Sequence, residues 1–209
     1  AAIDADLLVI MDAKRGDIGS TSSAYAAGGI GHDAPFPSDA LTINPWLGID
    51  TLDPFLKRAD ETGSGLFILN RTSNPGADDL QGQIVNGQPL YHHLATFIAP
   101  LVTKRDGKQG GSSLGIVAGA TWPKEARALR ATLPSAPFLI PGFGAQGGSP
   151  EKATSGLIRG QHGWEGGLIN STRGLIFPET AERAGSLAAW QNAIAATIDQ
   201  NKAILNSVF

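Results

Sequence analysis

Three charged side chains near the start of the sequence have types and spacing that suit acid–base chemistry. Asp12, Lys14 and Asp17 occur in the segment DAKRGD, which Met11 separates from the aliphatic run LLVI. Residues two apart on a strand face the same side, so we expect Asp12 and Lys14 to point in one direction. An ammonium between carboxylates stays protonated and could protonate a carbanion, while a carboxylate crowds an anionic substrate group. The alternatives are an ion-pair network that closes the strand end, or capping of the next helix by Asp17.

A glycine-rich loop, PGFGAQGG at 141–148, carries Gly142, Gly144 and Gly147 in the spacing G-x-G-x-x-G. That motif is typical of dinucleotide binding only after a first strand with an acidic residue ending the next, and neither condition holds here. The loop could still present backbone N–H groups to a phosphate, and Gln146 would add a side-chain donor. The alternative is a plain turn.

Two further polar residues are candidates for substrate binding. Arg173 follows the last predicted strand, where barrel enzymes often bind phosphate, and arginine can contact phosphate with two N–H groups. Ser73, in NRTSNPG at 70–76, could recognise the amide edge of a planar ring. The alternatives are a surface arginine and an Asx-type turn. The four histidines are isolated or lack metal-ligand spacing, so we predict no metal site.

Short aliphatic runs with the length of buried strands alternate with segments of helical spacing, and Leu187 to Leu205 form one apolar helix face. This alternation predicts a single α/β domain over residues 1–209 with a parallel sheet. Polar residues follow nearly every strand, which favours a (β/α)8 TIM barrel over a doubly wound sheet, although only about six βα units are visible. The predicted strands are 7–10, 40–43, 65–69, 114–118, 137–140 and 167–170.

The composition excludes several classes of protein and site. A net charge of −3 offers no basic surface for nucleic acid or anionic membrane, and no apolar run approaches the roughly 20 residues that span a bilayer. Because the sequence has no cysteine, it can hold no disulfide, thiolate nucleophile or zinc–thiolate site. A cytoplasmic location is consistent with this composition.

Four motifs occur in order after successive strands: DAKRGDIGST, TSNP, PGFGAQGG and STRG. Together they resemble the orotidine 5'-phosphate decarboxylase family, and DAKRGDIGST with AYA and LTINPWLG is similar to its second, mycobacterial-type branch. The resemblance covers nearly the whole chain. It implies a TIM barrel that converts orotidine 5'-monophosphate to uridine 5'-monophosphate with no metal and no organic cofactor.

The resemblance also implies roles for the charged residues. Lys14 would protonate C6 of the pyrimidine after carbon dioxide leaves, and Asp12 would lie against the substrate carboxylate and destabilise the ground state. Asp17, Ile18 and Thr21 would reach across a homodimer interface into the partner's site.

Four other residues would bind the substrate if the resemblance holds. Ser73 would recognise the amide edge of the pyrimidine, and Pro141 would line the base pocket. Gln146 and Arg173 would hold the 5'-phosphate, whose binding energy closes loops over the base.

The sequence departs from the family pattern in two respects. It starts near the helix that leads into the family's third strand. We therefore expect two further βα units, with a ribose-binding aspartate and the first lysine of a Lys-Asp-Lys-Asp array, in a longer chain or a second polypeptide. Thr172 stands where a glycine is often found.

Two other functions remain as alternatives. A magnesium-dependent sugar-phosphate lyase or aldolase of the same barrel superfamily also uses Asp-x-Lys-x-x-Asp, although TSNP and GAQGG favour the nucleotide enzyme. A catalytically inactive nucleotide-binding or assembly protein is the third possibility.

Overall fold

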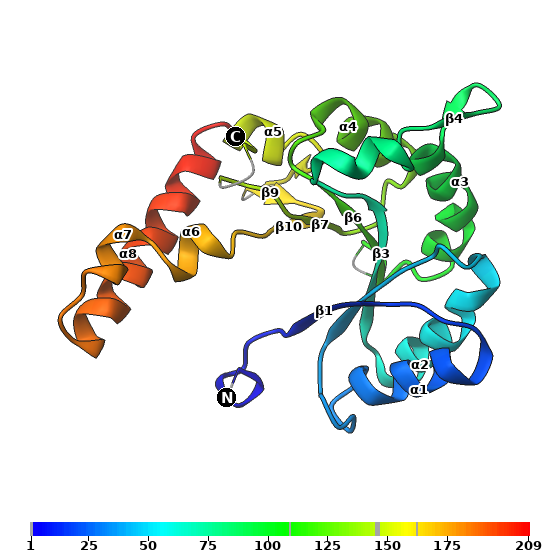
Figure 1. Cartoon of the computed structure of the whole chain (residues 1–209), viewed down its shortest axis with the longest axis horizontal. Helices are drawn as coiled ribbons and strands as arrows, with labels where there is room; N and C mark the ends of the chain where they lie inside the picture. Colours follow the sequence, from blue (N-terminus) through cyan, green and yellow to red (C-terminus); the bar gives the residue numbers. More distant parts are fainter. Residues whose placement is uncertain (1, 109, 145–146, 162) are drawn as a thin grey trace.

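A computed structural model describes residues 2–108, 110–144, 147–161 and 163–209. Six parallel strands form one curved sheet in the order β1-β2-β3-β6-β7-β10 (Figure 1). Because all six strands run the same way, their carboxyl ends meet at one edge of the sheet. Their bounds are β1 (Ile10–Arg15), β2 (Ala40–Ile43), β3 (Gly65–Arg71), β6 (Leu114–Ala118), β7 (Phe138–Ile140) and β10 (Gly167–Ile169).

Helices follow the strands along the chain. In Figure 1, α1 and α2 lie together beside the first strands, whereas α6, α7 and α8 extend away from the sheet beyond β10. The helices are α1 (Gly19–Gly29), α2 (Asp53–Thr62), α3 (Leu90–Thr103), α4 (Pro123–Thr132), α5 (Pro150–Ala153), α6 (Arg173–Ile176), α7 (Glu179–Glu182) and α8 (Leu187–Asn206). Short elements complete the chain: η1 (Ile3–Ala5), η2 (Ile49–Leu52), η3 (Pro75–Asp79) and the hairpins β4 (Ile84–Val85) with β5 (Gln88–Pro89) and β8 (Ile158–Arg159) with β9 (Trp164–Glu165).

The two faces of the sheet bury different residues. On one face, strand residues such as Leu41 and Ile68 pack against helix residues such as Phe55 and Ile98 in the main core. The smaller cluster on the other face contains strand residues only: Ala40, Phe67, Val117 and Leu139, with Ile10 and Leu69 against them. Because side chains alternate along each strand, those on one face of the sheet pack against the helices. Those on the other face pack against side chains of neighbouring strands.

The prediction of an α/β fold with six βα units is confirmed. The prediction for the first strand was wrong, because β1 covers Ile10–Arg15 and not residues 7–10. Its start is fixed by pairing of Ile10 with Ala40, and Leu7 and Leu8 are 62% and 84% exposed. Asp12 and Lys14 therefore lie within the strand and do not follow it, whereas Asp17 lies beyond its end.

The closing helix α8 was predicted at the right place, but its apolar face is not buried. Trp190 is 40% exposed and Ile198 is 36% exposed. Within the part of the chain that the structure describes, no helix is both long enough and apolar enough to cross a membrane.

Candidate active site

Asp12 and Lys14 form an ion pair at the carboxyl end of β1. The Lys14 ammonium lies 2.6 Å from an Asp12 oxygen, and the two side chains are 48% and 58% exposed. Thr42 on β2 donates its hydroxyl hydrogen to the other Asp12 oxygen over 2.9 Å. The same hydroxyl accepts the backbone N–H of Lys14, also over 2.9 Å. Thr42 is fully buried and therefore holds both members of the pair from the neighbouring strand.

The backbone at Lys14 has φ of 51°, in the left-handed region that side chains other than glycine rarely adopt. The pairing of β1 with β2 is irregular between Met11 and Arg15, around this residue. The expected contact between Asp12 and Lys14 is present, but strand alternation alone does not produce it. Such a conformation costs about 1–3 kcal/mol, and strained residues of this kind gather at functional sites.

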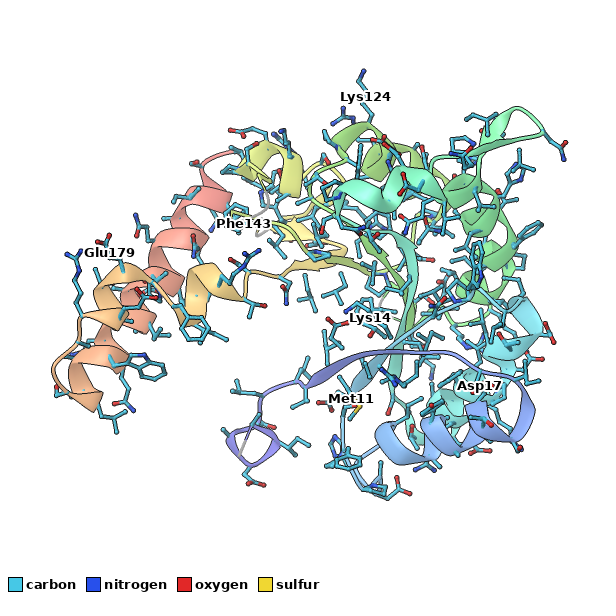
Figure 2. The ribbon with its side chains drawn as sticks, viewed as in Figure 1. Met11, Lys14, Asp17, Lys124, Phe143 and Glu179 are labelled. Carbon is cyan, nitrogen blue, oxygen red and sulfur yellow. The ribbon has the colours of Figure 1, made fainter. Side chains whose placement is uncertain are left out.

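Asp17 lies beyond the ion pair, at the approach to α1 (Figure 2). Its carboxylate accepts the N–H of Ile18 over 2.8 Å, and the hydroxyl of Ser22 donates to its backbone carbonyl. The residue that caps α1 is Ile18, so capping by the Asp17 side chain, one of the alternatives, is not what the structure shows. Among the described residues, Lys14 forms an ion pair with Asp12 and not with Asp17.

A close approach of β1 to the next strand requires a glycine at position 16. A Cβ at Gly16 would lie 2.7 Å from the carbonyl oxygen of Asn44, and the N–H of Asn44 donates to Arg15 over 2.7 Å. Ile18 and Thr21 lie just after this point and are both exposed. Exposure leaves the first turn of α1 accessible to another chain.

Ser73 lies in the loop between β3 and η3, and neighbouring elements hold that loop. The hydroxyl of Thr121 donates to the Ser73 carbonyl over 3.2 Å, and the indole N–H of Trp122 donates to the Thr72 carbonyl over 2.8 Å. A Cβ at Gly119 would lie 2.8 Å from the Ser73 backbone, so glycine allows β6 to end against this loop.

Three backbone N–H groups of the glycine-rich loop after β7 form hydrogen bonds within the loop. Gly144, Gly147 and Gly148 donate to Gly148, Gly144 and Gly142 respectively, over 2.8–3.1 Å. These bonds favour the plain turn over a phosphate cradle made from those N–H groups. Gln146 lies outside the described residues.

Pro141 and Arg173 lie on the β7–β10 side of the sheet. The carbonyl of Pro141 accepts the N–H of Ala120 over 2.9 Å, which joins the ends of β6 and β7. Arg173 is exposed at the first position of α6, without a carboxylate partner in the described ranges. Because β1 and β10 are opposite ends of the strand order, Lys14 and Arg173 come from the two edges of the sheet.

A cavity of about 970 Å³ lies at the other end of the strands. It is lined by residues that precede strands, including Asp39, Ser64, Ser113 and Pro137. The predicted site residues lie at or after the carboxyl ends of the strands, so this cavity is not the candidate site.

Sequence reasoning missed Thr42 as a contact of Asp12. The signal that could have revealed it is a lone hydroxyl in the aliphatic strand ALTI, because a buried hydroxyl needs a hydrogen-bond partner. No group of three or more histidine, aspartate or glutamate side chains is placed to hold a metal ion in the described part of the chain.

Comparison with known proteins identifies the family. A profile of the orotidine 5'-phosphate decarboxylase / HUMPS family matches residues 1–185. The orotidine 5'-phosphate decarboxylase of Rhodopirellula baltica is 39% identical over 209 residues, covering 96% of this chain and 68% of that protein. That of Haloarcula marismortui is 46% identical over 171 residues, covering 81% of this chain and 56% of that protein.

Solved structures agree with the sequence matches. UMP synthase of Leishmania donovani aligns with a TM-score of 0.73 and 34% identity, over 96% of this chain and 40% of that chain. OMP decarboxylase of the same organism aligns with a TM-score of 0.68 and 33% identity, over 93% of this chain and 69% of that chain. The chain spans between 56% and 68% of the length of the two curated relatives named above. It belongs to the orotidine 5'-phosphate decarboxylase / HUMPS family.

Proposed function

We propose that this chain contributes the catalytic ion pair of an enzyme that decarboxylates orotidine 5'-monophosphate to uridine 5'-monophosphate in pyrimidine synthesis. The observation that carries the proposal is the Lys14 ammonium, 2.6 Å from Asp12 at the carboxyl end of β1. The names of the relatives support it, since those proteins are orotidine 5'-phosphate decarboxylases.

The chemistry follows from the two charges. The Asp12 carboxylate faces the carboxylate of the substrate, and repulsion between them is relieved when the C6–carboxylate bond breaks and carbon dioxide leaves. The electron pair of that bond stays on C6, and Lys14 donates its proton there, after which solvent reprotonates the amine. Thr42 fixes the pair through its contacts with the Asp12 oxygen and the Lys14 N–H.

The rest of the proposed site binds the nucleotide. Ser73 recognises the amide edge of the pyrimidine, and Pro141 lines the base pocket. Gln146 and Arg173 hold the 5'-phosphate. The exposed guanidinium of Arg173, at the start of the helix that follows the last strand, supports that role.

A homodimer and a cytoplasmic location belong to the same proposal. Apolar side chains are exposed around the first turn of α1 and after β2, where Ile18 is 64%, Trp46 65% and Leu47 54% exposed. Ile18, with Asp17 and Thr21, would enter the partner's site. Light scattering of the parent and of Ile18→Asp tests this surface, and a monomer in both would contradict it.

Turnover of orotidine 5'-monophosphate by the purified protein in excess chelator tests the proposed activity. We expect uridine 5'-monophosphate and carbon dioxide in equal amounts. Product formation that requires added magnesium, or turnover only of a sugar phosphate, would overturn the proposal. Absence of both turnover and uridine 5'-monophosphate binding would overturn it as well.

A further inference from the structure

Arg71, at the end of β3, is a charged side chain in an almost fully buried position. It is 2% exposed, and its guanidinium carbon lies 3.8 Å from the centroid of the Trp122 ring and 5.4 Å from that of Tyr91. Burial, and after it the Glu125 carboxylate, raises the pKa of the Tyr91 phenol, which keeps that ring neutral. A guanidinium between aromatic rings is attracted to both, which offsets part of the cost of burying its charge.

The charge of Arg71 is only partly compensated. One guanidinium nitrogen lies 2.7 Å from Asp78 on η3 and 3.9 Å from Glu125 on α4. The other two, Nε and Nη1, are buried with no hydrogen-bond partner within the described ranges. An unpaired buried donor destabilises the folded state, so stability alone does not explain an arginine at position 71.

The partners of Arg71 are the same residues and elements that hold the loop of Ser73. Trp122 stacks on the guanidinium and also donates to the Thr72 carbonyl over 2.8 Å. The carbonyl of Arg71 itself accepts the N–H of Gly119 over 2.7 Å, and Gly119 is in close contact with Ser73. On the other side, Asp78 lies in the helical turn η3, which starts directly after the loop.

We infer that Arg71 is a positioning residue that fixes the Ser73 loop and so gives the site its preference for uracil over cytosine. Uracil presents an N–H donor and a carbonyl acceptor, whereas cytosine presents an acceptor and an amino group at the same positions. A serine hydroxyl can donate or accept, so the loop discriminates between them only if its backbone is held in one place. This inference rests on the proposed function, in which Ser73 contacts the base.

The test is calorimetric binding of uridine and cytidine 5'-monophosphates to the parent protein, Arg71→Met, Arg71→Lys and Asp78→Asn. We expect Arg71→Met to lower the ratio of the two affinities by about 3- to 30-fold, the range of couplings carried through a packed network. Arg71→Lys keeps the charge but loses the flat stacking surface, so its ratio should lie between those of the parent and Arg71→Met. Asp78→Asn should give a smaller loss than Arg71→Met.

Asp60→Asn is the matched control. Asp60 is 49% exposed and lies 2.8 Å from Arg105, which is 11% exposed, a pair of the same kind outside this cluster. The control should keep the ratio of the parent, and thermal unfolding of every variant checks that each is folded. An unchanged ratio in folded Arg71→Met would overturn the inference. A parent protein that binds uridine 5'-monophosphate no better than cytidine 5'-monophosphate would instead contradict the proposed role of Ser73, and the inference with it.

Discussion

Two charged clusters, one on the edge strand β1 and one on the central strand β3, differ in how much water reaches them. The Lys14 side chain is 48% exposed beside an Asp12 that is 58% exposed. Arg71 is 2% exposed under two aromatic rings, whereas its partner Asp78 is 56% exposed. The first cluster keeps its charges accessible to a ligand, whereas the second encloses its cation and holds a loop. A cation at a strand end can therefore react or position, and its surroundings decide which.

Replacing Lys14 should have the largest effect on activity. Lys14→Met removes the proposed proton donor, so we expect kcat/KM for orotidine 5'-monophosphate to fall by about 10²- to 10⁴-fold. The free energy of unfolding should change little, because the side chain is half exposed. Steady-state kinetics and denaturant unfolding check both.

Lys57→Met serves as the control for Lys14→Met, since Lys57 is an exposed lysine paired with Glu61 on α2. It should retain the activity of the parent. If Lys14→Met kept most of its activity, Lys14 could not be the proton donor. The exposed cluster would then have no catalytic role to set against the positioning role of Arg71.

Unfolding free energies should distinguish the buried Arg71 from its exposed partner Asp78. Asp78→Ala leaves the buried guanidinium with Glu125 at 3.9 Å as its remaining carboxylate in the described ranges, and we expect a loss of about 1–3 kcal/mol. Arg71→Met removes the charge itself and leaves a flexible apolar side chain against Trp122 and Tyr91, so its change should stay within about 1 kcal/mol. Urea unfolding measures both free energies. The reverse order would show that Arg71 is retained for stability.

Replacing Thr42 should have a smaller effect on activity, and this effect should act only through the exposed pair of Asp12 and Lys14. Thr42→Val keeps the shape of the side chain but removes the hydrogen bond to Asp12 and the acceptor for the Lys14 N–H. Each hydrogen bond of this kind contributes about 1 kcal/mol, a factor of about five, so we expect the loss of one or both to lower kcat/KM by about 5- to 30-fold, with Thr42→Ser close to the parent. In the Lys14→Met background, Thr42→Val should leave kcat/KM almost unchanged, because Thr42 acts through the pair that Lys14 forms with Asp12. Additive losses would contradict this.

The sequence predicted the central strands well and the first strand poorly, for a physical reason. Runs such as LGIVA are buried on both faces, so their composition marks the strand. The start of β1 depends on pairing of Ile10 with Ala40, which are far apart in the sequence. Leu7 and Leu8 have the composition of a strand but lie outside this pairing.

In the candidate site too, local features could be predicted from the sequence, and features that depend on packing could not. Residue types predicted the contact between Asp12 and Lys14, since charge and spacing are local properties. The left-handed backbone of Lys14 and its bond to Thr42 depend on how two strands meet, which no local pattern records. Arg71 followed an aliphatic run like any other polar residue, and only the packing of Trp122 and Tyr91 shows that it is buried.

The smallest expected effect concerns the polar contacts that anchor the edge strand. The Asp39 carboxylate accepts the Val9 N–H over 2.7 Å and contacts His32 at 2.8 Å, and these two bonds lower the pKa of Asp39. A carboxyl group whose pKa is lower in the folded state stabilises the fold above its ordinary pKa, about 3.9, and that contribution is lost as pH falls through the folded value. Asp39→Asn should therefore melt slightly below the parent at pH 7, and the two should converge as the pH falls below the lowered pKa of Asp39. Thermal unfolding across this range measures the difference. A difference that did not change with pH would mean that the shape of the hydrogen bonds, and not the charge of Asp39, holds the start of β1 to the sheet.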